Sequence, residues 1–585
     1  MSSPIDFLWG VEIALRDGAK LNATLYRPLD GARPLPCIVA VTPYICDRYH
    51  RRGVYFASNG WPFLTVDVRG RGNSQGTFRP YIQESEDGYD VIEWVANQPW
   101  CNGQVALWGG SYAGYAQWTI AATRPPHLAT LVPVAAPYLG LDFPMRNNVF
   151  YPYLMQWIML TAGKAAQDQL FTDEAFWAQC FRRWWTSGRP FRELDAMLGN
   201  ASAQFQEWLS HPEVGPFWDA HNPKPEQYRD ITIPILSITG SYDDDQPGAL
   251  EHYRQHLQNA ADTERAPHYL IIGPWDHYRC GTPQLEFGGL RLGPESLLDL
   301  QKLHLQWYAW ALQGAPKPDF LRKPVAYYVM GAERWRYAQT LEEITDHHQR
   351  LFLDSEGSAD ELFAAGSLSV EPGRGAPDIF TYDPRISDGP EVPAESRVLS
   401  DSLVDTRVHW ALGAHQLIYH SAPFDKNTEV SGFFEFAAWI AIDCPDTDLY
   451  VSVFEITEQG TAIRLSTDVM RARYREGLRI PKLIATTEPL LYDFQRFTFV
   501  SRLIRCGHRL RLIIAPIGRA IQARFTQRNF NAGGVVAEES AAQARRVTVR
   551  LYHDAERPTV LKIPIGRPIA ADEPTVPAAA LQQAP

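Results

Sequence analysis

The stretch that decides the fold is QVALWGGSYAGYAQWTIAAT, residues 104–123. Residues 104–108 form an apolar run that predicts a buried strand, and residues 115–123 predict a helix. The turn between them, residues 109–114, is rich in glycine and has Ser111 near its centre. A turn this sharp needs small residues, because larger side chains would collide with the strand and the helix. The Ser111 hydroxyl then lies at the positive end of a helix dipole, where a nucleophile is useful.

A strand, a glycine turn with a central serine and a helix form the nucleophile elbow of α/β-hydrolases. The strict pattern places Gly two residues after the serine, whereas here Ala113 occupies that position and Gly114 follows. Alanine is small enough for the turn. The alternative interpretation is a glycine-rich turn with an uninvolved serine, and the partner residues described below argue against it.

Strand and helix patterns alternate around the elbow. Apolar runs predict strands at residues 5–14, 21–27, 37–42, 61–68, 104–108, 131–135, 235–239 and 268–272, and further helices at 86–97 and 296–313. This alternation indicates an α/β fold with a mainly parallel sheet and helices on both of its faces.

Two other regions differ in character. Residues 138–229 are rich in aromatic side chains and helix-like, and from about residue 350 short alternating strands and turn residues dominate. The first pattern indicates a helical cap and the second an all-β sandwich or jelly roll. We therefore expect three parts: an α/β-hydrolase catalytic domain (1–140 and 230–340), a helical cap insertion (141–229) and a C-terminal β-sandwich of the jelly-roll type (341–585).

Composition excludes some classes of function. The chain has 585 residues and a net charge of −12, which argues against a nucleic-acid partner because such partners favour a basic surface. No apolar run is long enough to cross a membrane. Seven cysteines, an odd number without regular spacing, favour a reducing compartment. The N-terminal residues lack the pattern of a secretory signal. We expect a cytoplasmic enzyme, and a homo-oligomer is compatible with the sequence.

An elbow serine needs a histidine to take its proton and a carboxylate to orient that histidine. On this fold the acid follows the serine in the chain and the histidine comes last. The run 235–239 ends in GSYDDD, where Asp243 is the expected acid. Asp244 and Asp245 are weaker candidates, because three adjacent carboxylates repel one another and at most one is expected to be buried against the histidine. The alternative for Asp243 is an acidic surface loop or a helix N-cap.

The expected base is His277, in the GPWDH loop after the predicted strand at 268–272. His252, His256 and His304 lie in predicted helices and fit less well, and His268 lies within a strand. The alternative for His277 is a loop histidine with local hydrogen bonds.

A developing oxyanion needs hydrogen-bond donors. The backbone N–H of Tyr112, directly after the serine, is one expected donor. A second should come from the loop after an earlier strand, where Tyr44 lies, and a tyrosine hydroxyl is a suitable donor. From the residues alone Tyr44 is one loop tyrosine among several. The histidines and acids show no spacing typical of metal ligands, and the RGRGNSQG loop (residues 69–76) is interpreted as structural, so we expect no metal and no cofactor.

Several stretches together resemble the cocaine esterase / X-Pro dipeptidyl-peptidase family, which includes α-amino-acid ester hydrolases and glutaryl acylases. They are RDGAKLNATLYRP, TPY, DVRGRGNSQGTF, WVANQPWCNGQVALWGGSYAGY, GSYD and GPWDH, spread over roughly the first 320 residues. VSG, LYVSVFEI and GHRLRLIIA extend the resemblance less sharply into the C-terminal half. It implies the same three-part architecture as above.

The resemblance also implies roles for single residues. It makes Ser111 the nucleophile, Asp243 the orienting acid and His277 the base, with the Tyr44 hydroxyl and the Tyr112 N–H in the oxyanion hole. In α-amino-acid ester hydrolases, acidic residues two and three positions after the triad acid help to bind the substrate's ammonium group. Those positions are Asp245 and Gln246 here, so such a pocket would be partial.

The sequence predicts a serine hydrolase that cleaves an ester or amide bond of a small acyl, aminoacyl or peptidyl substrate through an acyl-enzyme. An acyltransferase on the same scaffold is one alternative. A catalytically silent protein whose β-sandwich binds carbohydrate is another. Expected partners are small-molecule esters, amides or short peptides.

Overall fold

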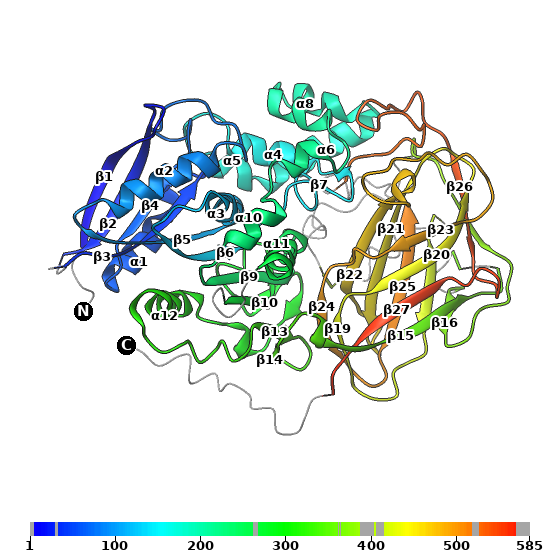
Figure 1. The fold of residues 1–585 in the computed structure, drawn as a ribbon. Coiled ribbons are helices and arrows are strands. Elements are labelled where there is room, and N and C mark those ends of the chain that lie inside the picture. The colour runs from blue at the N-terminus through cyan, green and yellow to red at the C-terminus, as the bar shows by residue number, and fades with distance from the viewer. Residues whose placement is uncertain are drawn as a thin grey trace.

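The computed structural model describes residues 5–568 except 30–32, 261–266, 358, 361, 363, 387–402, 405–414 and 517–525. Figure 1 shows a helix-covered sheet on one side, a β-rich region on the other and a group of short helices, including α4, α6 and α8, near their junction.

The N-terminal half is built on a ten-stranded sheet with parallel central strands. The strand order is β1-β2-β4-β3-β5-β6-β9-β10-β13-β14, and the pairs at both edges are antiparallel. The predicted α/β fold is confirmed. The strands are β1 (Ile5–Ala14), β2 (Lys20–Pro28), β3 (Leu35–Thr42), β4 (Phe63–Asp67), β5 (Cys101–Gly110), β6 (Leu128–Val134), β9 (Ile235–Tyr242), β10 (His268–Asp276), β13 (Val325–Val329) and β14 (Arg334–Ala338).

Helices cover both faces of this sheet (Figure 1). Phe56 of α1 and Trp307 of α12 share a core with Ala106, whereas Trp118 of α3 shares a core with Leu107 on the opposite face. Adjacent residues of β5 thus point to opposite sides, as in any strand. The flanking helices are α1 (His50–Ser58), α2 (Glu84–Ala96), α3 (Tyr112–Ala122), α11 (Gln246–Asn259) and α12 (Leu300–Gln313).

Two helices begin elsewhere than the sequence pattern predicts. Helix α3 begins at Tyr112 rather than at residue 115, because Gly114 lies within its first turn and not in the turn before it. A Cβ on Gly114 would lie 2.8 Å from the Val134 carbonyl oxygen, so this glycine allows the helix to approach β6 closely. Helix α12 begins at Leu300, after a short 3₁₀ turn at Pro294–Ser296.

The chain between β6 and β9 is helical apart from one small hairpin. Its tryptophan side chains are buried, and Trp184 and Trp208 belong to the same core as Leu107 of the sheet. The inserted helices therefore pack as a continuation of the sheet's core, not as a separate body. The elements are β7 (Met145–Arg146), β8 (Val149–Phe150), α4 (Tyr153–Leu160), α5 (Asp168–Thr172), α6 (Glu174–Ser187), α7 (Leu194–Met197), α8 (Ala203–Leu209), α9 (Pro216–Asp219) and α10 (Pro225–Asp230).

The C-terminal part is β-rich, with a sheet of thirteen strands and a core of its own. An all-β C-terminal domain was expected; its jelly-roll topology stays a prediction. The strands are β15 (Thr345–Asp354), β16 (Gly366–Ser369), β17 (Asp378–Tyr382), β18 (Leu417–Ser421), β19 (Thr428–Gly432), β20 (Glu435–Ile442), β21 (Asp448–Ile456), β22 (Ala462–Arg471), β23 (Leu490–Phe494), β24 (Val500–Ile504), β25 (Arg509–Pro516), β26 (Val547–Tyr552) and β27 (Val560–Gly566).

The β7–β8 hairpin joins the inserted segment to the β-rich domain. Its two turn residues, Asn147 and Asn148, have positive φ values of 50° and 64°, a conformation that asparagine tolerates better than most residues. The Asn147 amide donates to Asp468 Oδ1 (2.9 Å) and to the Val469 carbonyl (2.8 Å) on β22.

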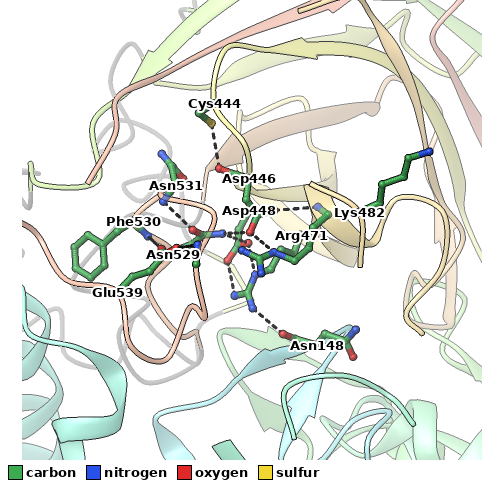
Figure 2. A network of polar contacts seen from close by, with 12 residues as sticks. Asn148, Cys444, Asp446, Asp448, Arg471, Lys482, Asn529, Phe530, Asn531 and Glu539 are labelled. Carbon is green, nitrogen blue, oxygen red and sulfur yellow. Dashed lines mark hydrogen bonds and ion pairs between the residues drawn. The ribbon is translucent and has the colours of Figure 1, made fainter. Parts of the chain in front are cut away.

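A buried ion pair lies directly beyond this turn (Figure 2). Arg471 donates to both carboxylate oxygens of Asp448, at 2.8 and 3.0 Å, and to the backbone carbonyl of Asn148 at 2.9 Å. The Asn529 amide donates to Asp448 (2.9 Å) and Asp446 (3.1 Å). The hairpin thus contributes a carbonyl to a network that the β-rich domain otherwise completes itself.

Candidate active site

The elbow turn holds Ser111 in a strained conformation between β5 and α3. Ser111 has φ 58° and ψ −125°, which is rare for a residue with a side chain. A Cβ on Gly109 would lie 2.5 Å from the Ala113 Cβ. Alanine at position 113 is therefore compatible with the elbow because position 109 is glycine.

The expected acid and base meet at the carboxyl ends of neighbouring strands. Asp243 follows β9, His277 follows β10, and His277 Nδ1 lies 2.8 Å from Asp243 Oδ1. A carboxylate accepts only, so Nδ1 carries the proton of this bond, and Nε2 is the nitrogen that can act as a base when His277 is neutral. The Asp243 side chain is fully buried, whereas 26% of the His277 side chain is exposed.

Other donors hold the Asp243 carboxylate in place. Thr239 Oγ1 donates to its Oδ2 (2.8 Å), the Asp245 backbone N–H donates to its Oδ1 (3.0 Å), and the Cys280 thiol lies 3.8 Å from Oδ2. These contacts fix the orientation of the Asp243 carboxylate relative to His277.

Ser111 bonds to a tyrosine and not to the histidine. Tyr44, in the loop after β3, donates its hydroxyl proton to Ser111 Oγ over 3.4 Å. Within the described residues, no hydrogen bond joins Ser111 to His277. In enzymes of this kind such a bond is often long or absent until substrate binds.

The backbone N–H of Tyr112 lies in the first turn of α3, where helix geometry leaves N–H groups without an acceptor in the helix. Its side chain is fixed below the elbow: the hydroxyl donates to Glu84 and accepts from the Tyr81 N–H at 3.1 Å. Burial raises the pKa of Glu84 to about 7. Sequence reasoning missed Glu84, since one acid in a helix rich in acids carries no signal.

Further carboxylates surround His277. Asp245 Oδ2 lies 3.6 Å from His277 Nδ1. Burial, with the nearby charges of Asp243 and Asp244, raises the pKa of Asp245 to about 8 although His277 acts against it. Burial disfavours charge on His277 as well, but the carboxylates of Asp245 and Asp243 outweigh it and raise the pKa of His277 to about 10.

A buried acid from the inserted segment joins this group. Burial, then the charge of Asp245, raises the pKa of Asp142 well above its usual range. Asp142 accepts from the backbone N–H groups of Tyr138 (2.8 Å) and Gly248, the latter in the first turn of α11. The sequence contains a feature that could have identified this residue, because Asp142 is a lone charged residue in the apolar run LGLDFPM.

Gln246, the other expected substrate-binding residue, is used within the protein. Its amide donates to the Gly240 (2.9 Å) and Phe499 (3.3 Å) carbonyls, and its Oε1 accepts from the Phe499 N–H (2.6 Å). Gln246 is fully buried. It joins the catalytic sheet to the β-rich domain and is left out of the substrate-binding set.

The histidines set aside earlier lie elsewhere. His252, His256 and His268 pack around Trp118 behind the elbow helix. Burial lowers the pKa of His252 to about 3, so it is neutral. In the part of the chain that the structure describes, no three histidine, cysteine or acidic side chains gather as a metal site would require, and no helix has the length and apolar character to span a bilayer.

A strained elbow serine, a tyrosine hydroxyl bonded to it and a histidine–aspartate pair at the same edge of a parallel sheet define the α/β-hydrolase class of serine hydrolases. Comparison with known proteins agrees. The profile of the X-Pro dipeptidyl-peptidase (S15) family matches residues 17–279, and that of the X-Pro dipeptidyl-peptidase C-terminal non-catalytic domain matches residues 321–529. The chain belongs to this family, also represented by cocaine esterase, and is a serine hydrolase.

Relatives match over nearly the whole chain. Cocaine esterase of Rhodococcus sp. (strain MB1 Bresler) is 24% identical over 594 residues, which cover 95% of this chain and 98% of the esterase. An aminopeptidase from a marine sediment Thaumarchaeota archaeon has the same fold, with a TM-score of 0.80 at 22% identity over 96% of this chain and 97% of its own. An α-amino acid ester hydrolase has a TM-score of 0.81 at 19% identity, with the same coverage.

Proposed function

We propose that the enzyme cleaves an ester or amide bond through an acyl-enzyme carried by Ser111. In this proposal His277 transfers the proton, Asp243 orients His277, and the Tyr44 hydroxyl and the Tyr112 N–H bind the oxyanion. The observation that carries it is the Tyr44–Ser111 contact of 3.4 Å together with the His277–Asp243 contact of 2.8 Å, both at the carboxyl ends of parallel strands.

The reaction has two half-reactions. The Ser111 oxygen bonds to the substrate carbonyl carbon while its proton passes to His277 Nε2, and the carbonyl π electrons move onto oxygen. The oxyanion then collapses, the bond to the alcohol or amine breaks, and that leaving group takes the proton from His277. Water repeats the sequence on the acyl-enzyme and releases the carboxylic acid and free Ser111.

The test is labelling by a fluorophosphonate probe together with ester turnover. Wild-type enzyme should be labelled, and Ser111→Ala should lose both labelling and turnover while its circular dichroism spectrum is unchanged. Ser210→Ala replaces an exposed serine and should behave like wild type. Turnover retained by Ser111→Ala would overturn the proposal. Absence of labelling in the wild type would favour a silent binding protein.

The acids beside His277 favour a substrate with an ammonium group near its scissile bond. Asp245 and Asp142 are buried, and the charge of Asp245 raises the pKa of Asp142, so a substrate cation beside Asp245 would stabilise the ionised form of these acids. The Asp142 oxygens also accept backbone N–H groups, which fixes that carboxyl toward α11. Aminoacyl esters, anilides and short peptides with a free N-terminus are the substrates that this charge would select.

Two esters that differ only in the ammonium group test this preference. The methyl ester of L-phenylalanine should have a lower KM than that of 3-phenylpropionate, and Asp245→Asn should remove most of the difference. Asp244→Asn, at the exposed neighbouring position, is the matched control. Equal KM values for both esters in the wild type would reject the aminoacyl class and leave neutral acyl esters.

A further inference from the structure

The Tyr44 hydroxyl has a second partner besides Ser111. The indole Nε1–H of Trp157, on α4 of the inserted segment, donates to the Tyr44 oxygen over 3.3 Å. An indole N–H is only a donor, so the tyrosine oxygen must accept there. The single proton of the phenol is then directed to Ser111 Oγ, 3.4 Å away.

Stacked rings fix the Trp157 indole. It lies parallel to Tyr81 (5.5 Å between ring centroids, 22°), to Tyr112 (6.0 Å, 18°) and to Trp208 (6.2 Å, 28°). Only 4% of Trp157 is exposed. One side chain therefore contacts both residues that the proposed function places in the oxyanion hole: Tyr44 through its N–H and Tyr112 through its ring face.

Arg71 links the end of α4 to the loop that carries Tyr44. Its guanidinium is fully buried and donates to the Pro43 carbonyl (2.8 Å), directly before Tyr44. It also donates to the carbonyls of Leu160 (3.3 Å) and Ala162 (2.9 Å), where α4 ends. The loop that carries Tyr44 and the helix that carries Trp157 are thus joined through one side chain.

We propose that Trp157 is a positioning residue of the oxyanion hole, acting through the Tyr44 hydroxyl. The inference rests on the proposed function, because it needs Tyr44 to donate to the developing oxyanion. A donor on the tyrosine oxygen polarises its O–H bond, so the phenol donates more strongly when negative charge forms on the substrate. Trp157 also occupies an acceptor position of the Tyr44 oxygen, which leaves the hydroxyl proton directed to the Ser111 side, where the oxyanion would form.

A residue with this role should affect kcat and leave KM nearly unchanged. Trp157→Phe keeps an aromatic ring in the stack and removes the N–H, so we expect kcat to fall about 5- to 20-fold, the effect of one lost hydrogen bond, with little change in KM. The loss should be the same for acetyl, butyryl and benzoyl esters, because Tyr44 binds the oxyanion and not the acyl group. A loss that varies with acyl size would assign Trp157 to the acyl pocket and overturn the inference.

A double-mutant cycle with Tyr44→Phe gives the decisive readout. In a Tyr44→Phe background the hydroxyl is absent, so Trp157→Phe should lower kcat less than about twofold further. Trp208→Phe, in the same stack, is the matched control and should give equal effects in both backgrounds. If the losses from Trp157→Phe and Tyr44→Phe multiply, the inference is overturned while the proposed function stands.

Two further measurements cover a variant that fails to fold and separate this inference from the proposed function. If Trp157→Phe does not fold by circular dichroism, β-(3-benzothienyl)alanine at position 157 keeps the shape of the indole without its N–H and should give the same cycle. Turnover retained by Ser111→Ala would overturn the proposed function and this inference with it. If Ser111→Ala is inactive but the losses from Trp157→Phe and Tyr44→Phe multiply, only this inference is overturned.

Discussion

At the scale of single residues, the charge on Asp245 governs how strongly His277 holds its proton. The two side chains are 3.6 Å apart, and the charge of the Asp245 carboxylate raises the pKa of His277 more than any other neighbouring group does, against the effect of burial. Because His277 must be neutral to accept the serine proton, the ionised form of Asp245 works against catalysis in the free enzyme. A substrate cation beside Asp245 would cancel that charge and lower the pKa of His277 as it binds.

Asp245→Asn should therefore extend activity to lower pH. Removing the negative charge lowers the pKa of His277, so the acid limb of kcat/KM for a neutral ester should move down by about one pH unit or more. The measurement is the pH profile of both proteins, and Asp244→Asn, which removes a charge with a smaller effect on the pKa of His277, should move the acid limb less. An acid limb that stays in place would mean that Asp245 does not govern the base.

Glu84 gives a second prediction, on stability. Its pKa is about 7 in the folded protein and its ordinary value is 4.5, so the folded state holds the proton more tightly. The wild type should then lose stability as pH rises from 4.5 to 7, by up to about 3 kcal/mol, and no more from this group above 7. Glu84→Gln cannot titrate. The difference in unfolding free energy between wild type and variant, from urea denaturation, should fall across this window, and a constant difference would contradict the assignment.

At the scale of elements, the elbow depends on close contacts between β5, α3 and β6. Gly109 faces Ala113 and Gly114 faces the Val134 carbonyl, each nearer than a side chain allows, whereas a Cβ on Gly110 would have no neighbour closer than 3.6 Å. The three glycines around Ser111 thus differ in how closely their neighbours approach, which the sequence pattern alone does not distinguish.

Gly109→Ala should destabilise the protein by about 1–3 kcal/mol, because its Cβ would meet Ala113 at 2.5 Å and β5 would have to move away from α3. Gly110→Ala, one residue away, should cost much less. Thermal unfolding of the two variants gives the comparison, and equal losses would show that the elbow has room at both positions.

The sequence predicts the elements that carry the triad but not those that support it. Ser111, Asp243 and His277 each follow a recognisable apolar strand, so local pattern and chain order place them at one sheet edge. Trp157 is one of many aromatic residues in its segment and Glu84 one of several acids in its helix, and their roles depend on how the inserted helices pack over the elbow. Contacts between segments that are distant in the chain produce no periodic pattern of apolar residues from which they could be predicted.

At the scale of the whole molecule, the β-rich domain is attached through the β7–β8 hairpin as well as through the chain itself. The Asn147 amide satisfies buried acceptors on β22, and the Asn148 carbonyl accepts from Arg471 (Figure 2). Gln246 adds a second attachment, from α11 to Phe499. The two halves are expected to unfold together as long as these contacts persist.

Asn147→Gly keeps the backbone conformation of the turn and removes the amide. Asp468, fully buried, would lose a donor, so we expect a loss of about 1–3 kcal/mol and an earlier unfolding of one half. Differential scanning calorimetry should show a broadened or divided transition. A single transition at the wild-type temperature would mean that the hairpin contributes no coupling.

The Arg71 contacts limit where the chain can be joined to that of a relative in a hybrid enzyme. The guanidinium also donates to the Ala165 carbonyl, so its partners continue past the end of α4. Consider a hybrid in which the inserted segment up to a junction before residue 165 comes from one parent and Arg71 from another. The backbone carbonyls at the end of α4 would then be placed differently relative to Arg71, and the Tyr44 loop on the opposite side of Arg71 would shift. Splice points placed after Ala165, with α4 inherited from the same parent as the Tyr44 loop, keep the two in register.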